Sequence, residues 1–349
     1  MVYRLSLYAF KTLCWLQLRS TLSCFGKPSA RFYQYRSCDA MKVLIDCDPG
    51  IDDAIALGIA LSKKDLQIVG ITTVQGNVDV HQCAVNALKI LEAYDRLDIP
   101  VFKGSSTAII KHDKDAGHFH GKDGLGDVLK HGPDENVIQK EHGVSAINRL
   151  AQEHQGELTL IAIGPLTNLA LALRLNPSLP SQLKELIIMG GNYKGVGNVT
   201  MAAEFNFWAD PHAAQIVLEE FKCPKYLITW ELSRECFLTS NDVIQYCNTG
   251  TKQSEFKKMI LAAKGMVENH TSGFCDAVAV GVALYRDMIT KTHEVYATVE
   301  LEGTHTKGMV ICDWCPEFRI EGGVKKPNII IVDQIDEELY RKVFLNSTK

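Results

Sequence analysis

In Val43-Leu44-Ile45-Asp46-Cys47-Asp48-Pro49-Gly50-Ile51-Asp52-Asp53, an apolar strand runs straight into four carboxylates within eight residues. Because side chains alternate along a strand, the first two aspartates are expected on the same side of it. Pro49-Gly50 then favours a turn, and a helix is expected to begin near Ile51, with the last two aspartates in its first turn, where backbone amides favour negative charge. Open α/β sheets bind ligands at the carboxyl ends of their strands. The stretch therefore predicts a strand–turn–helix unit with a binding site at its turn.

Four carboxylates this close together repel one another and take up protons unless a cation or hydrogen-bond donors satisfy them. Oxygen ligands without a His or Cys at ligand spacing favour calcium or magnesium over zinc, and several carboxylates favour calcium. The alternative is a set of acids that only cap a helix and face water. That alternative explains Asp52 or Asp53 but not the pair of acids at the strand. The stretch therefore predicts a metal site, with Ca²⁺ as the expected ion.

Outward from this stretch, short apolar runs alternate with segments of helical periodicity, which is typical of βα units on a mostly parallel sheet. The apolar runs cover residues 42–45, 66–72, 158–163, 186–189 and 226–229, and the helical segments include 80–94 and 166–175. Asp210 followed by Pro211 predicts a helix that continues to Phe221. Residues 293–332 are expected to be rich in strands and 336–345 to be helical. We therefore predict one α/β domain over residues 41–349.

Residues 1–40 differ from this domain in charge. They contain six basic residues and one acid, Asp39, and subtracting their +5 from the net charge of −4 leaves −9 for the rest. A basic segment with so few acids is typical of a mitochondrial transit peptide, and a disordered tail is the alternative. We therefore expect a basic N-terminal extension on a protein that is cytoplasmic, or mitochondrial if residues 1–40 act as a transit peptide.

The composition of the 349 residues, 46% apolar and 22% charged, is that of a globular protein. The negative net charge does not favour a nucleic-acid partner, and no apolar run approaches the roughly 18 residues of a membrane helix. Eleven scattered cysteines fit a reduced compartment better than a disulfide framework. Cys312 and Cys315 form a CxxC pair without a second pair at zinc-site spacing, and we interpret them as two packed thiols.

The aspartate stretch, DCDPGIDD at residues 46–53, resembles the N-terminal signature of the inosine-uridine preferring nucleoside hydrolase family. The resemblance continues in order through TTVQGN at 72–77, HGKDGLG at 120–126, GPLTN at 164–168, MGG at 189–191 and EFN at 204–206. It covers essentially the whole chain from residue 41. It implies a doubly wound sheet with helices on both faces and Ca²⁺ as cofactor. The implied reaction is hydrolysis of the N-glycosidic bond of a small-molecule ribonucleoside to ribose and a free purine or pyrimidine base, by a homodimer or homotetramer.

The resemblance also assigns roles to single residues. The implied metal ligands are the carboxylates of Asp48, Asp53 and Asp276 and the backbone carbonyl of Ile163, and Asp48 is also the implied general base. The residues implied to bind the sugar are Asp52, Asn77, Asn198, Glu204 and Asn206, with Met189 at the 5′ side of the ribose. Carboxylates beside the ring would stabilise the positive charge that develops on the ribose as the bond breaks.

The chain departs from the family at the residue before the last metal aspartate. Many members place a His there, as the acid that protonates the leaving base, whereas this chain has Cys275. A thiol is a poorer hydrogen-bond donor than an imidazolium. The candidates for activating the base are therefore Cys275 itself, His120 on the base side, or stacking of the base on Trp230 or Phe205.

Two other functions stay open at this point. The missing His motivates a catalytically weak protein that binds nucleosides or metal. An aspartyl phosphatase shares the opening strand with two aspartates, but Pro49-Gly50 replaces the residues expected next, and no Thr or Ser and Lys follow in matching context. A phosphatase would release phosphate from nucleotides, whereas a nucleoside hydrolase would release the base from nucleosides.

Overall fold

A computed structural model describes residues 40–111, 120–129, 132–236, 238–249, 274–318 and 322–347. The predicted N-terminal extension lies outside the described residues except for Ala40. The unit of residues Ala40–Lys349 carries the fold described below.

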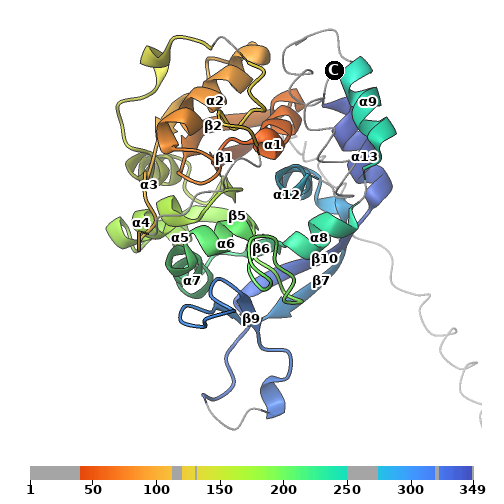
Figure 1. The fold of residues 1–349 in the computed structure, drawn as a ribbon. Coiled ribbons are helices and arrows are strands. Elements are labelled where there is room, and N and C mark those ends of the chain that lie inside the picture. Colours follow the sequence, from red (N-terminus) through yellow and green to blue (C-terminus); the bar gives the residue numbers. More distant parts are fainter. Residues whose placement is uncertain are drawn as a thin grey trace, which may run out of the picture. The chain divides into compact units, whose positions relative to one another are not determined.

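The described residues build an eight-stranded sheet in the order β3-β2-β1-β4-β5-β6-β10-β7 (Figure 1). All neighbouring strands pair in parallel except β10 and β7, which are antiparallel. The mostly parallel sheet is confirmed, and the run β3-β2-β1 in one direction and β4-β5-β6 in the other is a doubly wound order. The strands are β1 (Met41–Cys47), β2 (Leu66–Thr73), β3 (Val101–Lys103), β4 (Leu158–Ala162), β5 (Leu183–Met189), β6 (Lys225–Ile228), β7 (Ile289–Val295) and β10 (Ile329–Ile335).

Helices cover both faces of this sheet, because its parallel strands are apolar on both sides. In β1, Val43 and Ile45 belong to one half of the core and Leu44 to the other. The first half packs against α1 (Ile51–Ser62), α2 (Val80–Ala93), α8 (Trp230–Glu235), α9 (Ser240–Thr249), α12 (Cys275–Leu284) and α13 (Glu337–Asn346). The second half packs against α3 (Gly143–Glu153), α4 (Thr167–Leu175), α5 (Leu179–Gln182), α6 (Phe205–Ala209) and α7 (Pro211–Glu220).

The predicted helix starts are confirmed by their caps. The helix α1 begins at Ile51, and Asp210 caps α7 by accepting a hydrogen bond from Ala213 N at 3.0 Å. The C-terminal segment is strand-rich as predicted, with a separate antiparallel pair formed by β8 (Ala297–Val299) and β9 (Val310–Cys312). Short 3-10 turns complete the described elements at η1 (Glu135–Val137), η2 (Arg286–Met288) and η3 (Pro316–Phe318).

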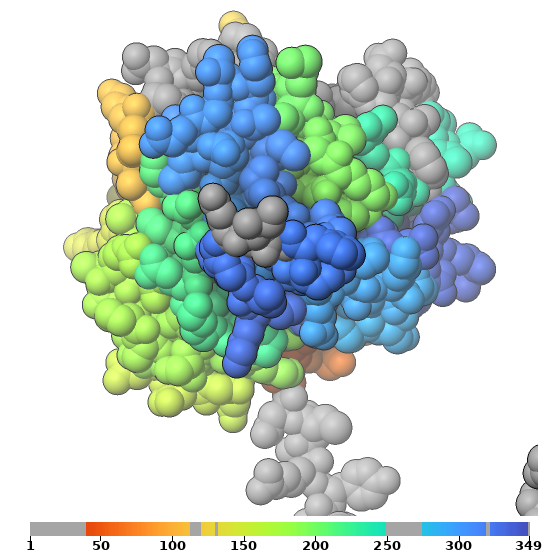
Figure 2. Space-filling view, turned by 90° about the horizontal axis from the view of Figure 1, so that it is seen from below, coloured from red at the N-terminus to blue at the C-terminus, as the bar shows by residue number. Residues whose placement is uncertain are grey.

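The segment that follows β9 leaves the body of the molecule (Figure 1). The interpretation of the CxxC pair as packed thiols is therefore wrong for Cys315, which is exposed, while Cys312 is half-buried. All cysteines among the described residues are free thiols. Figure 2 shows residues near 300 beside residues near 200, and Val310 N donates to Asn192 Oδ1 at 3.2 Å. Among the described residues, no helix has the length and apolarity that a membrane crossing requires.

Candidate active site

The strand order reverses between β1 and β4, and at this point a doubly wound sheet opens a crevice at its carboxyl edge. Asp48 follows β1 there, and Ile163 follows β4. Ile163 N donates to Asp46 O at 2.8 Å, which ties the two strand ends together. The carbonyl of Ile163 accepts a hydrogen bond from Asn206 Nδ2 at 3.1 Å. Segments far apart in the sequence thus meet at the edge where the motifs were expected to gather.

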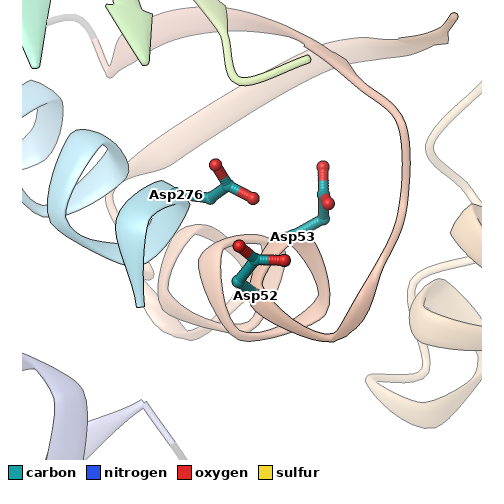
Figure 3. A group of neighbouring side chains, drawn as sticks. All are labelled: Asp52, Asp53 and Asp276. Carbon is teal, nitrogen blue, oxygen red and sulfur yellow. The ribbon is translucent and has the colours of Figure 1, made fainter. Parts of the chain in front are cut away.

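Three carboxylates converge at this edge from two helices. Asp52 and Asp53 come from the first turn of α1, and Asp276 comes from the first turn of α12 (Figure 3). Each offers an oxygen that lies within 4.8 Å of the others. We call Asp52, Asp53 and Asp276 the acid group. It joins the N-terminal signature to the distant carboxylate that the resemblance implied, because α1 packs against α12.

The surroundings of two members of the acid group, Asp53 and Asp276, favour their protonated forms. Burial and the charge of Asp52 raise the pKa of Asp53 to about 7. Burial and the charges of Asp52 and Asp53 raise the pKa of Asp276 well above its ordinary value. In addition, the buried Oδ1 of Asp52 has no hydrogen-bond partner among the described residues. Oxygen ligands that repel one another until they gain protons fit a hard divalent cation, which can take the place of those protons.

Asp48 lies beside the acid group but outside it. Its Oδ2 accepts a hydrogen bond from Asn77 N at 2.8 Å, and its own N–H donates to Asp53 Oδ1 at 3.2 Å. Burial and the charge of Asp53 raise the pKa of Asp48 well above its ordinary value. A carboxylate with a raised pKa is a stronger base once it is ionised, so this environment suits a residue that accepts a proton.

Two glycines make room for this carboxylate. A Cβ at Gly76 would lie 2.0 Å from Asp48 Oδ2, and a Cβ at Gly164 would lie 2.6 Å from Asp48 Oδ1. Real Cβ atoms do not approach that closely, so any side chain at either position would displace Asp48. The glycines of the TTVQGN and GPLTN blocks therefore have a role beyond a tight turn, because the backbone closes around a functional side chain.

We expect Gly76→Ala to lower kcat/KM by about 100-fold, because a displacement of roughly 1 Å at a reacting group costs that much. Steady-state kinetics with a ribonucleoside substrate, alongside thermal melting, measure the effect. Gly281→Ala in α12 is the matched control, since its Cβ would lie an ordinary 3.4 Å from the flexible side chain of Met288. Equal kcat/KM for Gly76→Ala and Gly281→Ala would contradict the close fit around Asp48.

Asp46, the first of the four aspartates in chain order, has different hydrogen-bond partners from Asp48. Its Oδ1 accepts hydrogen bonds from Thr72 Oγ1 and from Asn168 Nδ2, the latter at 2.8 Å. Asn168 Oδ1 in turn accepts from Ser105 N at 2.8 Å. Hydrogen bonds therefore satisfy Asp46 Oδ1, whereas its buried Oδ2 has no hydrogen-bond partner among the described residues, and burial raises the pKa of Asp46 to about 7. The sequence predicted that a cation or hydrogen-bond donors would satisfy the acids, and at Asp46 two donors bond one of the two carboxylate oxygens.

The structure brings several of the implied sugar-binding residues together. Asn77 Nδ2 donates to Asp48 O at 3.1 Å and to Asp53 Oδ2 at 3.2 Å. Asn206 Nδ2 lies within 3.3 Å of both the carbonyl oxygen and the sulfur of Met189. The Asn77 and Asn206 amides thus border the acid group and the carbonyl of Ile163, respectively.

Glu204 is buried at the start of α6. Its carboxylate accepts N–H groups of Gly191 at 2.7 Å, Asn206 at 2.9 Å and Phe207 at 3.2 Å. Burial raises the pKa of Glu204 to about 7. Asn198 is exposed in the loop before Glu204, and its N–H donates to Ala203 O at 3.1 Å. The structure thus places Glu204 next to Asn206. Asn198 makes no hydrogen bond to the other implied sugar-binding residues among those described.

The groups on the expected base side differ in what they can donate. His120 is buried, and its Nδ1 accepts a hydrogen bond from Ile51 N at 3.3 Å, so the ring proton is on Nε2, which lies 3.7 Å from Asp52 Oδ1. Burial lowers the pKa of His120, which favours the neutral ring. Cys275 begins α12, and burial together with the charge of Asp52 raises the pKa of its thiol well above the ordinary value. This thiol therefore holds its proton more tightly than a free cysteine.

The two aromatic candidates are half-buried. Trp230 begins α8 just after β6, and its backbone N–H donates to Gly191 O at 3.0 Å. Phe205 begins α6, with its ring centroid 6.3 Å from that of Trp208.

The sequence did not predict a role for Glu231, whose carboxylate accepts backbone N–H groups of the loop after β5. No pattern in the sequence indicates that role. Asn168, which donates to Asp46, could be found from the sequence because it lies in the GPLTN block.

Comparisons with known proteins show which family the chain resembles. The profile of the family described as "Inosine-uridine preferring nucleoside hydrolase" matches residues 43–342. The chain is 32% identical over 278 residues to the inosine-uridine preferring nucleoside hydrolase of Leishmania major, covering 78% of this chain and 88% of that protein. It is 31% identical over 277 residues to the pyrimidine-specific ribonucleoside hydrolase RihB of Escherichia coli, covering 78% and 87%. A solved inosine-guanosine nucleoside hydrolase superimposes with a TM-score of 0.81 at 33% identity, over 88% of this chain and 98% of that one.

Proposed function

Because the chain belongs to the inosine-uridine preferring nucleoside hydrolase family, we propose that it is a calcium-dependent hydrolase releasing ribose and a free purine or pyrimidine base. Its class follows from the family: it is a nucleoside hydrolase, acting on the N-glycosidic bond of a small-molecule ribonucleoside. Two members of the acid group, Asp53 and Asp276, support the metal part of the proposal, because they converge where the strand order reverses. Calcium and the breadth of bases are the parts that the experiments below test.

The residues that would hold the ion are Asp48, Asp53, Asp276 and the carbonyl of Ile163. Support comes from their oxygen-only chemistry, from the convergence of Asp53 with Asp276, and from the hydrogen bond between Asp48 N and Asp53. When bound, Ca²⁺ supplies Lewis-acid polarisation that lowers the pKa of a water molecule. A ligand set made only of oxygen atoms, most of them from carboxylates, suits calcium better than zinc.

Asp48 is proposed as the general base that takes a proton from the attacking water. Its buried carboxylate is fixed by Asn77 N and enclosed by Gly76 and Gly164, so it cannot turn away from the crevice. A positioned base of raised pKa accepts a proton efficiently near neutral pH. The same enclosure would exclude bulk water from the reacting centre.

The sugar would be held by Asp52, Asn77, Asn198, Glu204 and Asn206, with Met189 beside the 5′ position. Vicinal hydroxyl groups need both donors and acceptors, and carboxylates and amides supply them. Asp52 is suited to accept from a hydroxyl, because its buried Oδ1 has no hydrogen-bond partner among the described residues. The carboxylates of Asp52 and Glu204 would also stabilise the positive charge that develops on the ribose as the bond breaks.

The leaving base would be activated through Cys275, His120 or stacking on Trp230 or Phe205. We expect Cys275→His to change kcat for inosine or uridine by about tenfold or more, because a general acid contributes at least that much. Calcium affinity should change less, since Asp276 keeps its carboxylate. Steady-state kinetics and calcium titration measure the two effects, with Cys275→Ser as the control that adds no acid. Equal kinetic parameters for inosine, uridine and cytidine in both forms would remove Cys275 from the mechanism.

A panel of purine and pyrimidine ribosides, assayed in calcium and in metal-free buffer, tests the proposal. The named relatives are described by different bases, pyrimidine, inosine with uridine, and inosine with guanosine, so similarity alone does not rank them. Release of free base that depends on calcium is the expected result. Base release that is indifferent to calcium would overturn the metal assignment, and phosphate release from nucleotides would favour the phosphatase alternative.

We further propose that residues 41–349 are the catalytic domain, that residues 1–40 are an extension dispensable for catalysis, and that the enzyme is a homodimer or homotetramer. The support for the first point is that the family profile and the described fold both begin within a few residues of Met41.

A further inference from the structure

A second network around a buried carboxylate lies on β10, outside the acid group. The side chain of Asp333 is only 8% exposed. The hydroxyl of Tyr193 donates to its Oδ1, while Lys291 Nζ and His293 Nε2 lie 2.6 Å and 3.2 Å from its Oδ2. Lys194 Nζ lies further away, 3.9 Å from Oδ1. These partners come from the loop after β5 and from β7, so Asp333 connects three parts of the chain.

A β-bulge directs Asp333 toward these partners. On β7 the consecutive residues Thr292 and Lys291 pair with Val332 and Gln334 of β10, so Asp333 is an extra residue between them. A bulge of this kind redirects a side chain and occurs next to functional sites. Two of these partners also contact a third ring: the centroid of Trp314 lies 6.1 Å from that of Tyr193 and 5.5 Å from that of His293.

Asp333 is ionised in this setting. Burial opposes the charge, but hydrogen bonds from Lys291, Tyr193 and His293 lower the pKa of Asp333 to about 2. The hydroxyl of Tyr193 therefore donates to a charged acceptor, which is the stronger class of hydrogen bond. Loss of the carboxylate would leave the half-buried Tyr193 hydroxyl without this acceptor, whereas Lys291 is exposed and can bind water instead.

The other side of the same loop is held by α8. The Glu231 carboxylate accepts the N–H groups of Tyr193 at 3.2 Å, Lys194 at 2.8 Å and Val196 at 3.4 Å. Gly191 N donates to Glu204 at 2.7 Å. Residues 190–204, which we call the β5–α6 loop, are thus fixed by their backbone to α8 and by the Tyr193 side chain to β10.

We propose that Asp333 is a positioning residue for nucleoside binding, which acts through Tyr193 to hold the β5–α6 loop in place. This loop carries Asn198 and ends at Glu204, so the inference rests on the proposed function, in which both bind the sugar. Asp333 itself does not touch the substrate. Its contribution is to binding through Asn198 and not to bond cleavage, because the Glu204 carboxylate is also held by the N–H groups of Asn206 and Phe207 in α6, and the acid group and Asp48 stand on other elements.

The test compares Asp333→Asn and the milder Tyr193→Phe with a matched control. Glu185→Gln serves as that control, because the Glu185 side chain is also largely covered, at 14% exposed, and bonds to Arg286 at 2.8 Å, but near the amino end of β5. We expect KM for the preferred ribonucleoside to rise about tenfold in both variants with little change in kcat, as loss of uniform binding predicts. Glu185→Gln should leave KM unchanged.

Hydrogen exchange of the amides of residues 191–203 gives a readout that needs no turnover. Faster exchange in Asp333→Asn and Tyr193→Phe, but not in Glu185→Gln, supports the tether. Unchanged exchange in both Asp333→Asn and Tyr193→Phe, or an unchanged KM in an active enzyme, overturns the proposed role of Asp333. A wild-type protein that hydrolyses no ribonucleoside would overturn the proposed function instead, and the exchange rates would then decide the role of Asp333 separately.

Discussion

Asp48→Asn is expected to lower kcat by at least about 1,000-fold while the protein stays folded, because it removes both a proton acceptor and a ligand oxygen. The buried carboxylate is enclosed by Gly76 and Gly164, and the shape-matched amide fits the same space. The amide cannot accept a proton near neutral pH, so the loss falls on the chemical step. Steady-state kinetics with the preferred ribonucleoside measure it, and circular dichroism checks the fold.

The control is Asp46→Asn, an equally buried acid two positions earlier in the chain. Its partners Thr72 and Asn168 both donate to Oδ1, and an amide oxygen can still accept from them. We expect that variant to keep most of its kcat. Comparable kcat for Asp48→Asn and the wild type would remove Asp48 as the base. A wild type that binds ribonucleosides without turnover would favour the catalytically weak alternative.

The sheet could be predicted from the sequence because parallel strands buried on both faces read as continuous apolar runs. The same holds for the start of α1, where Pro49-Gly50 and the acids of the first turn mark a boundary. The place of the site also followed, since the aspartates stand where β1 ends. Only the packing of α12 on α1 brings Asp276 to this edge, and no local pattern shows that packing. Asp276 was therefore predicted from the family resemblance alone.

The roles of side chains within the site were harder to foresee. Asp46 and Asp48 look alike in sequence, yet Asn168, 122 positions away, donates a hydrogen bond to the first, while Asn77 N donates to the second. Tyr193 and Asp333 are 140 positions apart, and their contact depends on a bulge that no periodicity shows. Local patterns specify elements and their faces, whereas partners across the fold depend on how those elements pack.

Calcium is expected to raise the melting temperature by about 5 °C at pH 8 when present at roughly 100 times its dissociation constant, and by much less at pH 5.5. In the metal-free protein, burial raises the pKa of Asp53 to about 7 and that of Asp276 well above its ordinary value. A raised carboxyl pKa means that the protonated group stabilises the fold below the unfolded pKa. That stability is lost as the pH rises through the folded pKa. Calcium replaces these protons, so its stabilising effect grows over the same range.

The difference between calcium and metal-free buffer isolates the ligands. The pKa values of Asp46 and Glu204 are also raised to about 7 by burial, but neither is a proposed ligand, so both should weaken the fold with rising pH in either buffer. Thermal melting at pH 5.5, 7 and 8, in calcium, in magnesium and in metal-free buffer, measures the calcium gap, which is the difference in melting temperature between calcium and metal-free buffer. Asp53→Asn should weaken the pH dependence of this calcium gap, and the remainder would come from the other ligands with raised pKa values, such as Asp276. A calcium gap that is constant across pH, or larger at pH 5.5, would contradict a site built from these protonated carboxylates.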